Sequence, residues 1–486
     1  MRAMWTCGVV GLLALAGCGD EGGGGPSSSN NGAVTNNGVG TNNGVGTNNG
    51  AVACGGCAAS GLVCGASGVC VDPASDACGL VTSPATDDEL FVAALVPLGG
   101  FQSDTGELLQ NAVVLAMEEL GAGGFGAGLV VCDSARFPLN TAEVMGHLVD
   151  VVGVDVVIGP DTTRNVVEVL EEYTAPASIP LLSPVARGSI PVEHGGLLVR
   201  TIGRMEVEGT AIGARLAELR GQGEAARVVV IAEGSEEGGA LRDRVLAVLG
   251  EPGPSLFVHT LDGQVGQSQR EQIAQDAAAA MGGVDAVVVL AGSEIALFVD
   301  AFEGLGGGPV RYVLPSTGES PAVQRKVGER AELLERLEVV SVGLGASEVY
   351  DGFAAAYDAR YGRLPNVPAA NAYDAVWVAV YGWYAAGGRS GWPDGASVAS
   401  SVARLTSGAP VPVGLGGVPD ALRSLAGGGS IDLDGASGPL TFEPVTGEVA
   451  APLRRRVLVD LGGVLAWRDV ARYDADLAGE GVWTGL

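Results

Sequence analysis

Lysine is nearly absent from this sequence of 486 residues: Lys326 is the only lysine among 27 basic residues, and the formal net charge is −29. Nucleic-acid binding needs clustered cations that displace counterions from phosphates, so this acidic chain argues against a nucleic-acid partner. The one lysine follows Arg325 and not a glycine, which rules out a phosphate-binding P-loop. We therefore expect neither a nucleic-acid partner nor a nucleotide held by that loop.

Motifs of catalysis and of cofactor binding are also lacking. The three histidines are dispersed without an HExxH pattern, and no GxSxG nucleophile elbow occurs. Residues 121–126 match GxGxxG, but they follow a helix pattern and precede a strand, the reverse of a dinucleotide site. Residues 432–435 begin like a calcium loop but lack its third ligand position and its glutamate. We expect a protein that is not an enzyme and that has neither cofactor nor metal.

No apolar run is long enough to cross a bilayer, but a short one lies near the N-terminus. Arg2 precedes the apolar residues 7–16, which have the length of a signal-peptide core. The run ends in Leu15-Ala16-Gly17-Cys18, which resembles a bacterial lipobox. The resemblance implies that residues 1–17 are a signal peptide and that Cys18 is lipidated, so that the membrane is reached only through a lipid anchor.

The residue after Cys18 bears on which membrane holds the anchor. It is Gly19, whereas aspartate at this position retains lipoproteins in the inner membrane under the sorting rule known for some Gram-negative bacteria. We expect a location in the cell envelope, on the periplasmic or surface face, with the outer membrane slightly favoured. Residues 18–53 are then a linker of Gly, Ser, Asn and Thr, a composition that cannot bury enough apolar surface to fold.

Five cysteines crowd into the next segment, residues 54–80, and a sixth lies far downstream. An even number of cysteines outside the reducing cytosol predicts disulfides, here three. Zinc is the alternative, because Cys54-Gly-Gly-Cys57 is half of a zinc knuckle, but the second half is missing. We expect Cys78 to pair with Cys132 and the other four to pair within the segment. The candidates are Cys54, Cys57, Cys64, Cys70, Cys78 and Cys132.

From about residue 90, short apolar strand patterns alternate with helix patterns. Two sets of about five such strands predict an α/β fold with two lobes, each a parallel sheet covered on both faces. The clearest unit runs from Val156 to Gly188, as a strand, a polar turn, a helix, a second strand and a second turn. Ligands of open parallel sheets bind outside the carboxyl ends of the strands, where both turns fall.

Five passages, in family order over roughly residues 88–470, resemble the type 1 periplasmic binding proteins of the branched-chain amino-acid receptor (leucine-binding-like) family. They read LFVAALVPLGG, IGPDTT to LLSPVARG, LVRTIGRMEVEG, FAAAYDARYGRLPNVPAANAYDAVWVAVYG and SGPLTFEPVTGEV. The resemblance implies that residues 88–486 form two Rossmann-like lobes joined by three hinge crossovers, which close on a ligand. Carried over, lobe one covers about 88–203 and 346–437, and lobe two covers about 204–345 and 438–486.

The same resemblance implies ligand-binding positions in lobe one. Thr162 and Thr163 match the place where the family presents hydroxyls and backbone N–H groups to a ligand carboxylate, and a helix N-terminus suits an anion. An ordinary helix cap is the alternative. Val185 and Arg187 occupy the second turn, where the family usually has small residues followed by Thr or Ser. The Arg187 guanidinium either holds an anion or points to solvent.

In lobe two the resemblance implies contacts from Glu237, Ser293 and Thr317. Thr317 stands where amino-acid receptors often place a carboxylate that pairs with the ligand ammonium. Without that carboxylate an ammonium would be unpaired in a desolvated pocket. Unless Glu237 or Glu319 replaces it, an α-amino acid ligand is in doubt.

These observations lead to one expected function and one alternative. The expected function is capture of a small polar ligand, of the amino-acid or organic-acid class, for an ABC permease. The alternative is an envelope or sensory interaction module with the same fold and no transport role, such as a regulator of cell-wall synthesis.

Overall fold

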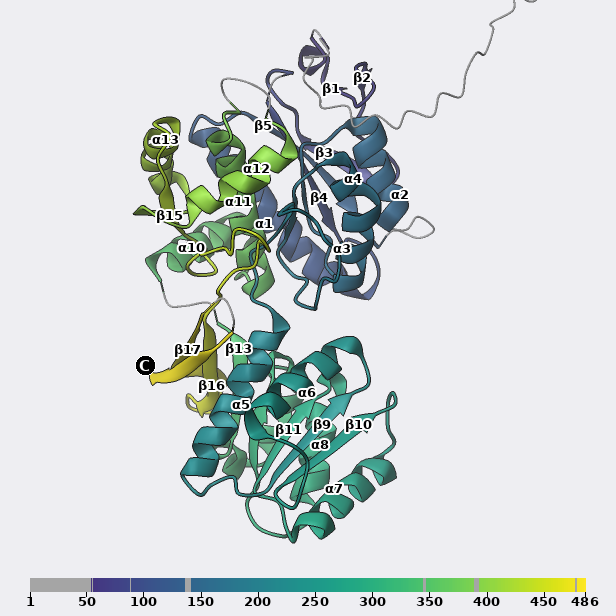
Figure 1. Ribbon diagram of the computed structural model, residues 1–486, viewed down its shortest axis with the longest axis vertical. Helices are drawn as coiled ribbons and strands as arrows, with labels where there is room; N and C mark the ends of the chain where they lie inside the picture. The colour runs from purple at the N-terminus through teal and green to yellow at the C-terminus, as the bar shows by residue number, and fades with distance from the viewer. Residues whose placement is uncertain are drawn as a thin grey trace, which may run out of the picture. The chain divides into compact units, whose positions relative to one another are not determined.

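The described residues form two large β-sheets, and each of them has helices packed on both faces (Figure 1). The computed structural model describes residues 54, 56–87, 89–135, 141–343, 347–388, 393–476 and 479–486. The expected signal peptide, Cys18 and the linker to residue 53 lie outside the described residues. None of the helices within these ranges is long and apolar enough to cross a membrane.

The first sheet has six strands in the order β3-β5-β4-β6-β7-β8, parallel except for β3 at one edge. Its strands are β3 (Cys78–Thr82), β4 (Leu90–Val96), β5 (Ala127–Asp133), β6 (Val156–Ile158), β7 (Leu181–Ser183) and β8 (Leu198–Arg200). Every side chain of β4 is buried, and alternate residues enter different cores: Val92 and Ala94 face one, Ala93 and Leu95 the other.

Helices from distant parts of the chain cover the two faces of this sheet. One core contains residues of α1 (Ser103–Ala122), α10 (Glu348–Tyr361), α11 (Val367–Ala385), α12 (Gly395–Ser401), α13 (Val418–Ala426) and of a small sheet of β14 (Ala409–Pro412) and β15 (Ile431–Asp434). The other contains residues of α2 (Thr141–Gly146), η3 (His147–Val152), α3 (Thr163–Val169) and η4 (Leu170–Thr174), which leads into α4 (Ala175–Ala177). Leu440, Phe442 and Val449, which follow β15, also lie in the first core.

The second sheet has eight strands in the order β10-β9-β11-β12-β13-β16-β17-β18. The first five are parallel and the last three are antiparallel: β9 (Val228–Glu233), β10 (Leu256–Leu261), β11 (Ala286–Leu290), β12 (Arg311–Leu314), β13 (Leu337–Val342), β16 (Leu453–Asp460), β17 (Leu465–Ala475) and β18 (Gly481–Gly485). Helices α5 (Met205–Gly221) and α6 (Glu236–Leu249) cover one face. Helices α7 (Gln267–Met281), α8 (Ile295–Glu303) and α9 (Pro321–Glu329) cover the other. The predicted α/β class with two parallel-rich lobes is confirmed.

The cysteine-rich segment forms the expected disulfides. Cys78 pairs with Cys132, which joins β3 to β5, and the other four cysteines pair as Cys54–Cys64 and Cys57–Cys70. The segment contains η1 (Ala58–Ser60), β1 (Val63–Cys64) and β2 (Cys70–Val71). It packs on lobe one, where the Ala66 N–H donates to the Val151 carbonyl at 3.2 Å and His147 Nε2 lies 3.1 Å from the Pro73 carbonyl.

Candidate functional site

Helix α3 begins at the polar turn that follows β6, as the sequence predicts. Thr162 caps it: the residue is extended, and its hydroxyl accepts a hydrogen bond from the Asn165 N–H at 3.2 Å. The helical path continues through η4 and α4 to Ala177. First-turn N–H groups such as those of Thr163 and Arg164 have no acceptor within a helix, and they carry its partial positive charge. The start of α3 can therefore receive an anionic group.

The second predicted turn, after β7, packs directly against the start of α3. The Thr163 hydroxyl accepts a hydrogen bond from the Gly188 N–H at 3.0 Å. A Cβ on Gly188 would lie 2.8 Å from that hydroxyl oxygen, so the close approach depends on glycine. Val185 is half-buried against the first core. The structure thus brings Thr162, Thr163, Val185 and Arg187 together at one edge of the sheet.

Arg187 is held by a carboxylate of the second lobe. Its Nη1 lies 2.6 Å from Glu208 Oε2, and its Nε donates to the Gly203 carbonyl at 2.8 Å. The side chain is 11% exposed and that of Glu208, on α5, is 1% exposed. The solvent-facing alternative for Arg187 is therefore wrong, and the anion beside it in this structure is Glu208.

Glu208 also holds a turn of lobe two. Its Oε1 accepts a hydrogen bond from the Ser316 N–H at 2.6 Å, and its Oε2 accepts one from the Ser316 hydroxyl at 3.2 Å. Ser316 begins η6 (Ser316–Gly318), the turn after β12. One buried carboxylate therefore joins the second turn of lobe one to a turn at the strand ends of lobe two. Neither Glu208 nor Ser316 is among the ligand contacts predicted from the sequence.

The three expected contacts of lobe two lie at neighbouring strand ends. Glu237 lies in the first turn of α6, Ser293 in η5 (Gly292–Glu294) and Thr317 in η6, and all three are exposed. They follow β9, β11 and β12, which are adjacent in the sheet, and a Cβ on Gly292 would lie 3.7 Å from Thr317. These residues thus share one edge, as expected of parallel strands.

Glu319 and Glu237 are the two carboxylates that could pair with the ammonium of an α-amino acid ligand. Glu319 forms an ion pair with Arg456 of β16, and burial raises the pKa of its carboxyl while Ser341 and Arg456 lower it. The Glu319 carboxylate is therefore already paired within lobe two. Glu294, beside Ser293, is likewise paired with Arg270 at 3.0 Å. Glu237 is the exposed carboxylate among the expected contacts.

Arg200, at the end of β8, supports the second turn from inside lobe one. Its side chain is 1% exposed; Nη1 donates to the Gly188 carbonyl at 2.7 Å and Nη2 lies 2.9 Å from Glu448 Oε1. Burial lowers the pKa of the Arg200 guanidinium, while Glu448 and Glu206 raise it. Arg200 is not among the residues predicted from the sequence to belong to the site.

Crystal structures of several solute-binding proteins share this fold. One is a Rhodopseudomonas palustris BisB5 protein of an ABC transporter in complex with 3,4-dihydroxybenzoic acid (19% identity, TM-score 0.58, 80% of this chain and 98% of that chain). Another, from the same species, binds 4-hydroxybenzoate (15% identity, TM-score 0.59, 80% and 99%). A third is the branched-chain amino-acid binding protein LivJ of Streptococcus pneumoniae with isoleucine (18% identity, TM-score 0.57, 79% and 99%). At these identities the likeness concerns the fold.

Comparison with curated proteins finds no match. The family model described as periplasmic binding protein matches residues 89–454, which is most of the chain and runs from the start of β4 to the start of β16. Its description places its members among binding proteins, not enzymes, and outside the cytoplasm. On this evidence the chain belongs to the periplasmic binding protein family.

Proposed function

We propose that the protein captures a small carboxylate-bearing solute between its two lobes. The start of α3 and the turn at 185–188 form one wall, and Glu237, Ser293 and Thr317 contribute to the other. The observation that carries the proposal is the Thr163–Gly188 hydrogen bond, because it sets the first-turn N–H groups of α3 beside the second turn. A carboxylate placed there would accept those N–H donors and meet the positive end of the helix.

Two features favour an organic acid over an α-amino acid. Position 317 carries a threonine, and Glu319 is already paired with Arg456, so only Glu237 of the considered residues is left to meet an ammonium. The ligands of the three structural relatives share a carboxylate, but only isoleucine adds an ammonium. A hydroxybenzoate-like acid needs a site for its carboxylate but no partner for an ammonium.

A thermal-shift panel on the purified protein tests this choice. We expect 4-hydroxybenzoate or 3,4-dihydroxybenzoate to raise the melting temperature, because a ligand that binds only the folded state stabilises it by mass action. Leucine and isoleucine should have a smaller effect. Stabilisation by the amino acids alone would contradict the proposed ligand class.

The physiological setting is part of the proposal. We place the protein in the cell envelope, anchored through Cys18 and working with an ABC permease. Radioactive palmitate should label the full-length protein and not a Cys18→Ser variant. Labelling of both proteins would contradict the anchor.

One observation favours the alternative, an interaction module without transport. The disulfide-bonded segment packs on lobe one and adds a surface that a solute cleft does not need. If no acid or amino acid in the panel shifts the melting temperature, an interaction module becomes the better hypothesis than solute capture.

A further inference from the structure

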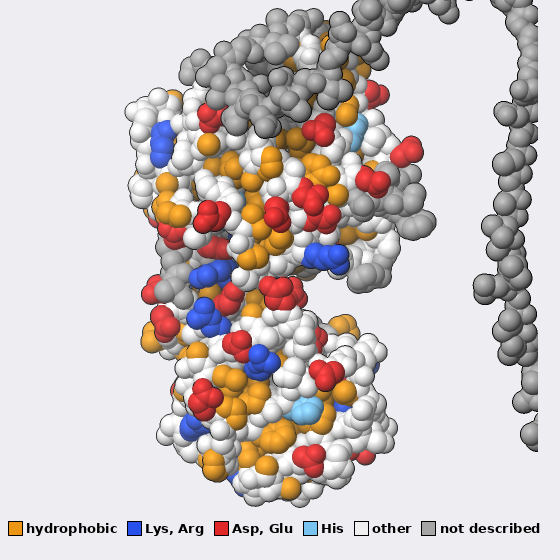
Figure 2. All heavy atoms as spheres, turned by 45° about the vertical axis from the view of Figure 1, so that its right-hand side comes forward, with side chains coloured by type: hydrophobic (Ala, Val, Ile, Leu, Met, Phe, Trp, Pro, Cys, Tyr) orange, Lys and Arg blue, Asp and Glu red, His pale blue; other side chains and the backbone are white. Residues whose placement is uncertain are grey.

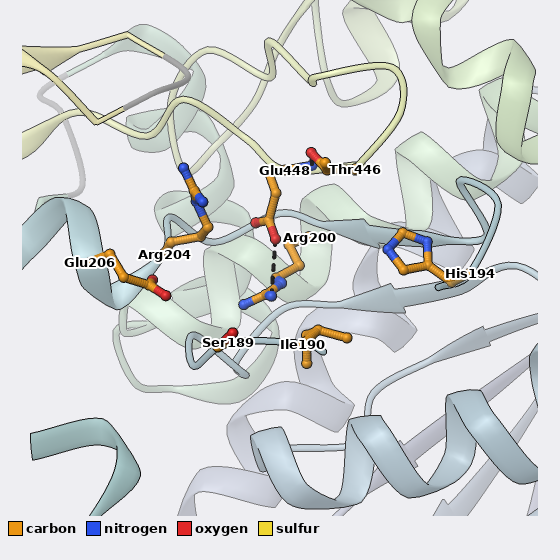
Figure 3. A pocket seen from close by; sticks show the side chains of 8 residues that line it. All are labelled: Ser189, Ile190, His194, Arg200, Arg204, Glu206, Thr446 and Glu448. Atoms are coloured by element: carbon orange, nitrogen blue, oxygen red, sulfur yellow. Dashed lines mark hydrogen bonds and ion pairs between the residues drawn. The ribbon is translucent and has the colours of Figure 1, made fainter. Parts of the chain in front are cut away.

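A small cavity lies beside the second turn of lobe one, apart from the residues proposed for the cleft (Figure 3). Its volume is about 180 Å³, and its lining residues are Ser189, Ile190, His194, Arg200, Arg204, Glu206, Thr446 and Glu448. None of them is among the expected ligand contacts. The cavity is therefore distinct from the predicted ligand site.

The cavity is bounded by two of the segments that connect the lobes. Arg204 and Glu206 lie where the chain leaves β8 and enters α5, and Thr446 and Glu448 precede β16. The Arg200 N–H donates to the Gly447 carbonyl at 2.8 Å, which ties the two segments together. Gly447 has a φ of +66°, and a Cβ there would lie 1.9 Å from the Leu198 carbonyl, so the contact depends on glycine.

Several buried polar atoms at the cavity have no hydrogen-bond partner among the described residues. They are Arg200 Nε, which is a donor, and Glu206 Oε2 and Glu448 Oε2, which are acceptors. Unpaired buried polar atoms are costly, so in native proteins they are usually matched by water or by a ligand. The Arg200 guanidinium itself is 1% exposed and points between Glu448 and Ser189 (Figure 3).

The lining carries balanced charge. Arg200 and Arg204 are cations, and Glu206 and Glu448 are anions. His194 Nδ1 accepts a hydrogen bond from the Leu198 N–H at 3.3 Å, and burial and Arg200 lower the pKa of its ring, which favours the neutral imidazole. A neutral lining with both unpaired donors and unpaired acceptors suits a ligand that carries both charges.

We propose that this cavity binds a small zwitterion, whose ammonium donates to Glu206 and Glu448 and whose carboxylate faces Arg200. The volume of about 180 Å³ is below the range of roughly 300–1,000 Å³ usual for drug-sized ligands. A molecule of the size of glycine or serine fits this volume, and a hydroxybenzoate lacks the ammonium that the two glutamates would bind. Ordered water is the competing occupant.

Because two connecting segments bound the cavity, its occupant stabilises one arrangement of the hinge over others. Glycine should then change the affinity for the cleft ligand, and the cleft ligand should change the affinity for glycine by the same factor. This consequence rests on the proposed function, whereas glycine binding itself does not.

Calorimetric titration of the full chain with glycine tests the site. We expect glycine and serine to bind, while acetate, methylammonium and glycine betaine, which lacks N–H donors, do not. Glu206→Gln keeps the size of the side chain and breaks no described ion pair, and it should weaken glycine binding at least about tenfold. Glu448→Gln should act in the same direction. Glu251→Gln, an exposed carboxylate of lobe two, is the matched control.

Three results would overturn the proposal. The first is no binding of any zwitterion, which leaves water as the occupant. The second is unchanged glycine affinity in folded Glu206→Gln. The third is loss of glycine binding in Thr163→Val, which would place glycine in the cleft. Titration with 4-hydroxybenzoate on the same samples shows separately whether the cleft function holds.

Discussion

At the scale of single residues, the surroundings of Arg187 decide its role. The sequence supplies a cation in the second turn, but its partner comes from a helix of the other lobe. Removing one member of a buried pair leaves the other charge uncompensated, which is far more costly than breaking an exposed pair. Glu208 is therefore expected to matter more for stability than other glutamates of α5.

We predict that Glu208→Ala lowers the free energy of unfolding by about 3–5 kcal/mol, because Arg187 and Ser316 lose their shared partner. Glu218→Ala on the same helix is the control, since Glu218 is 43% exposed in its pair with Arg215 and its loss should cost below about 1 kcal/mol. Urea denaturation measures both. Equal losses in the two variants would show that the Glu208 pair is not special.

A second residue-scale prediction concerns Asp374 of α11. The side chain is fully buried and accepts hydrogen bonds from the N–H groups of Ala436 and Ser437 and from the Ser437 hydroxyl. Burial raises the pKa of its carboxyl from 3.8 to about 7, although these hydrogen bonds lower it. The folded state thus binds a proton that the unfolded state has released between these two values.

The contribution of Asp374 to the free energy of unfolding should be full below about pH 4 and fall as the pH rises to about 7. Asp374→Asn does not titrate, so its unfolding free energy should lack this decline, whatever its absolute level. Urea denaturation at pH 4, 5.5, 7 and 8 gives both curves. Parallel curves for the two proteins would contradict the raised pKa.

At the scale of elements, the sequence predicts strands that are continuous apolar runs, but it does not predict strands that contain several charged residues. The strands Val156–Ile158 and Ala286–Leu290 are buried along their whole length, and strands buried on both faces leave an unbroken apolar run in the sequence. Strands β16 and β17 contain arginines that interrupt the apolar pattern, so that pattern does not predict them. Arg455 and Arg456 are tolerated there only because Glu338, Glu319 and Asp469 pair with them in the folded sheet.

Some residues of the candidate site have a local signal in the sequence, and others have none. Local turn chemistry predicted the positions of Thr162 and Thr163, because a cap and a strand end are encoded within a few residues. Glu208 has no local signal that separates it from an ordinary helical glutamate. Its role arises from contacts with Arg187 and Ser316, which lie far away in the sequence.

The disulfides give a prediction at this scale. Cys78–Cys132 closes 54 residues and joins two strands, while Cys54–Cys64 closes 10. By loop-closure entropy, replacing the first pair with alanines should cost about 4 kcal/mol and replacing the second about 3 kcal/mol. Thermal and urea unfolding of the two double variants compare them. A larger loss for the short loop would contradict this order.

At the scale of the whole molecule, two lobes with separate cores are joined where charged residues concentrate. Figure 2 shows acidic side chains scattered over the visible face, with several basic ones near the junction of the lobes. The pairs Arg187–Glu208 and Arg200–Glu448 lie among the connecting segments. The side chains of both pairs are at most 12% exposed, so loss of either partner would leave a poorly solvated charge at the junction.

The most direct test of the account is calorimetric titration of 4-hydroxybenzoate and isoleucine into the parent protein, Thr163→Ser and Thr163→Val. Serine keeps the hydroxyl that accepts from the Gly188 N–H, whereas valine removes it. We predict that the acid binds the parent and Thr163→Ser alike and binds Thr163→Val about tenfold more weakly, a loss of about 1.4 kcal/mol. Equal affinity of the acid for all three proteins would contradict a carboxylate site at the start of α3, and binding of isoleucine alone would contradict the organic-acid class of ligand.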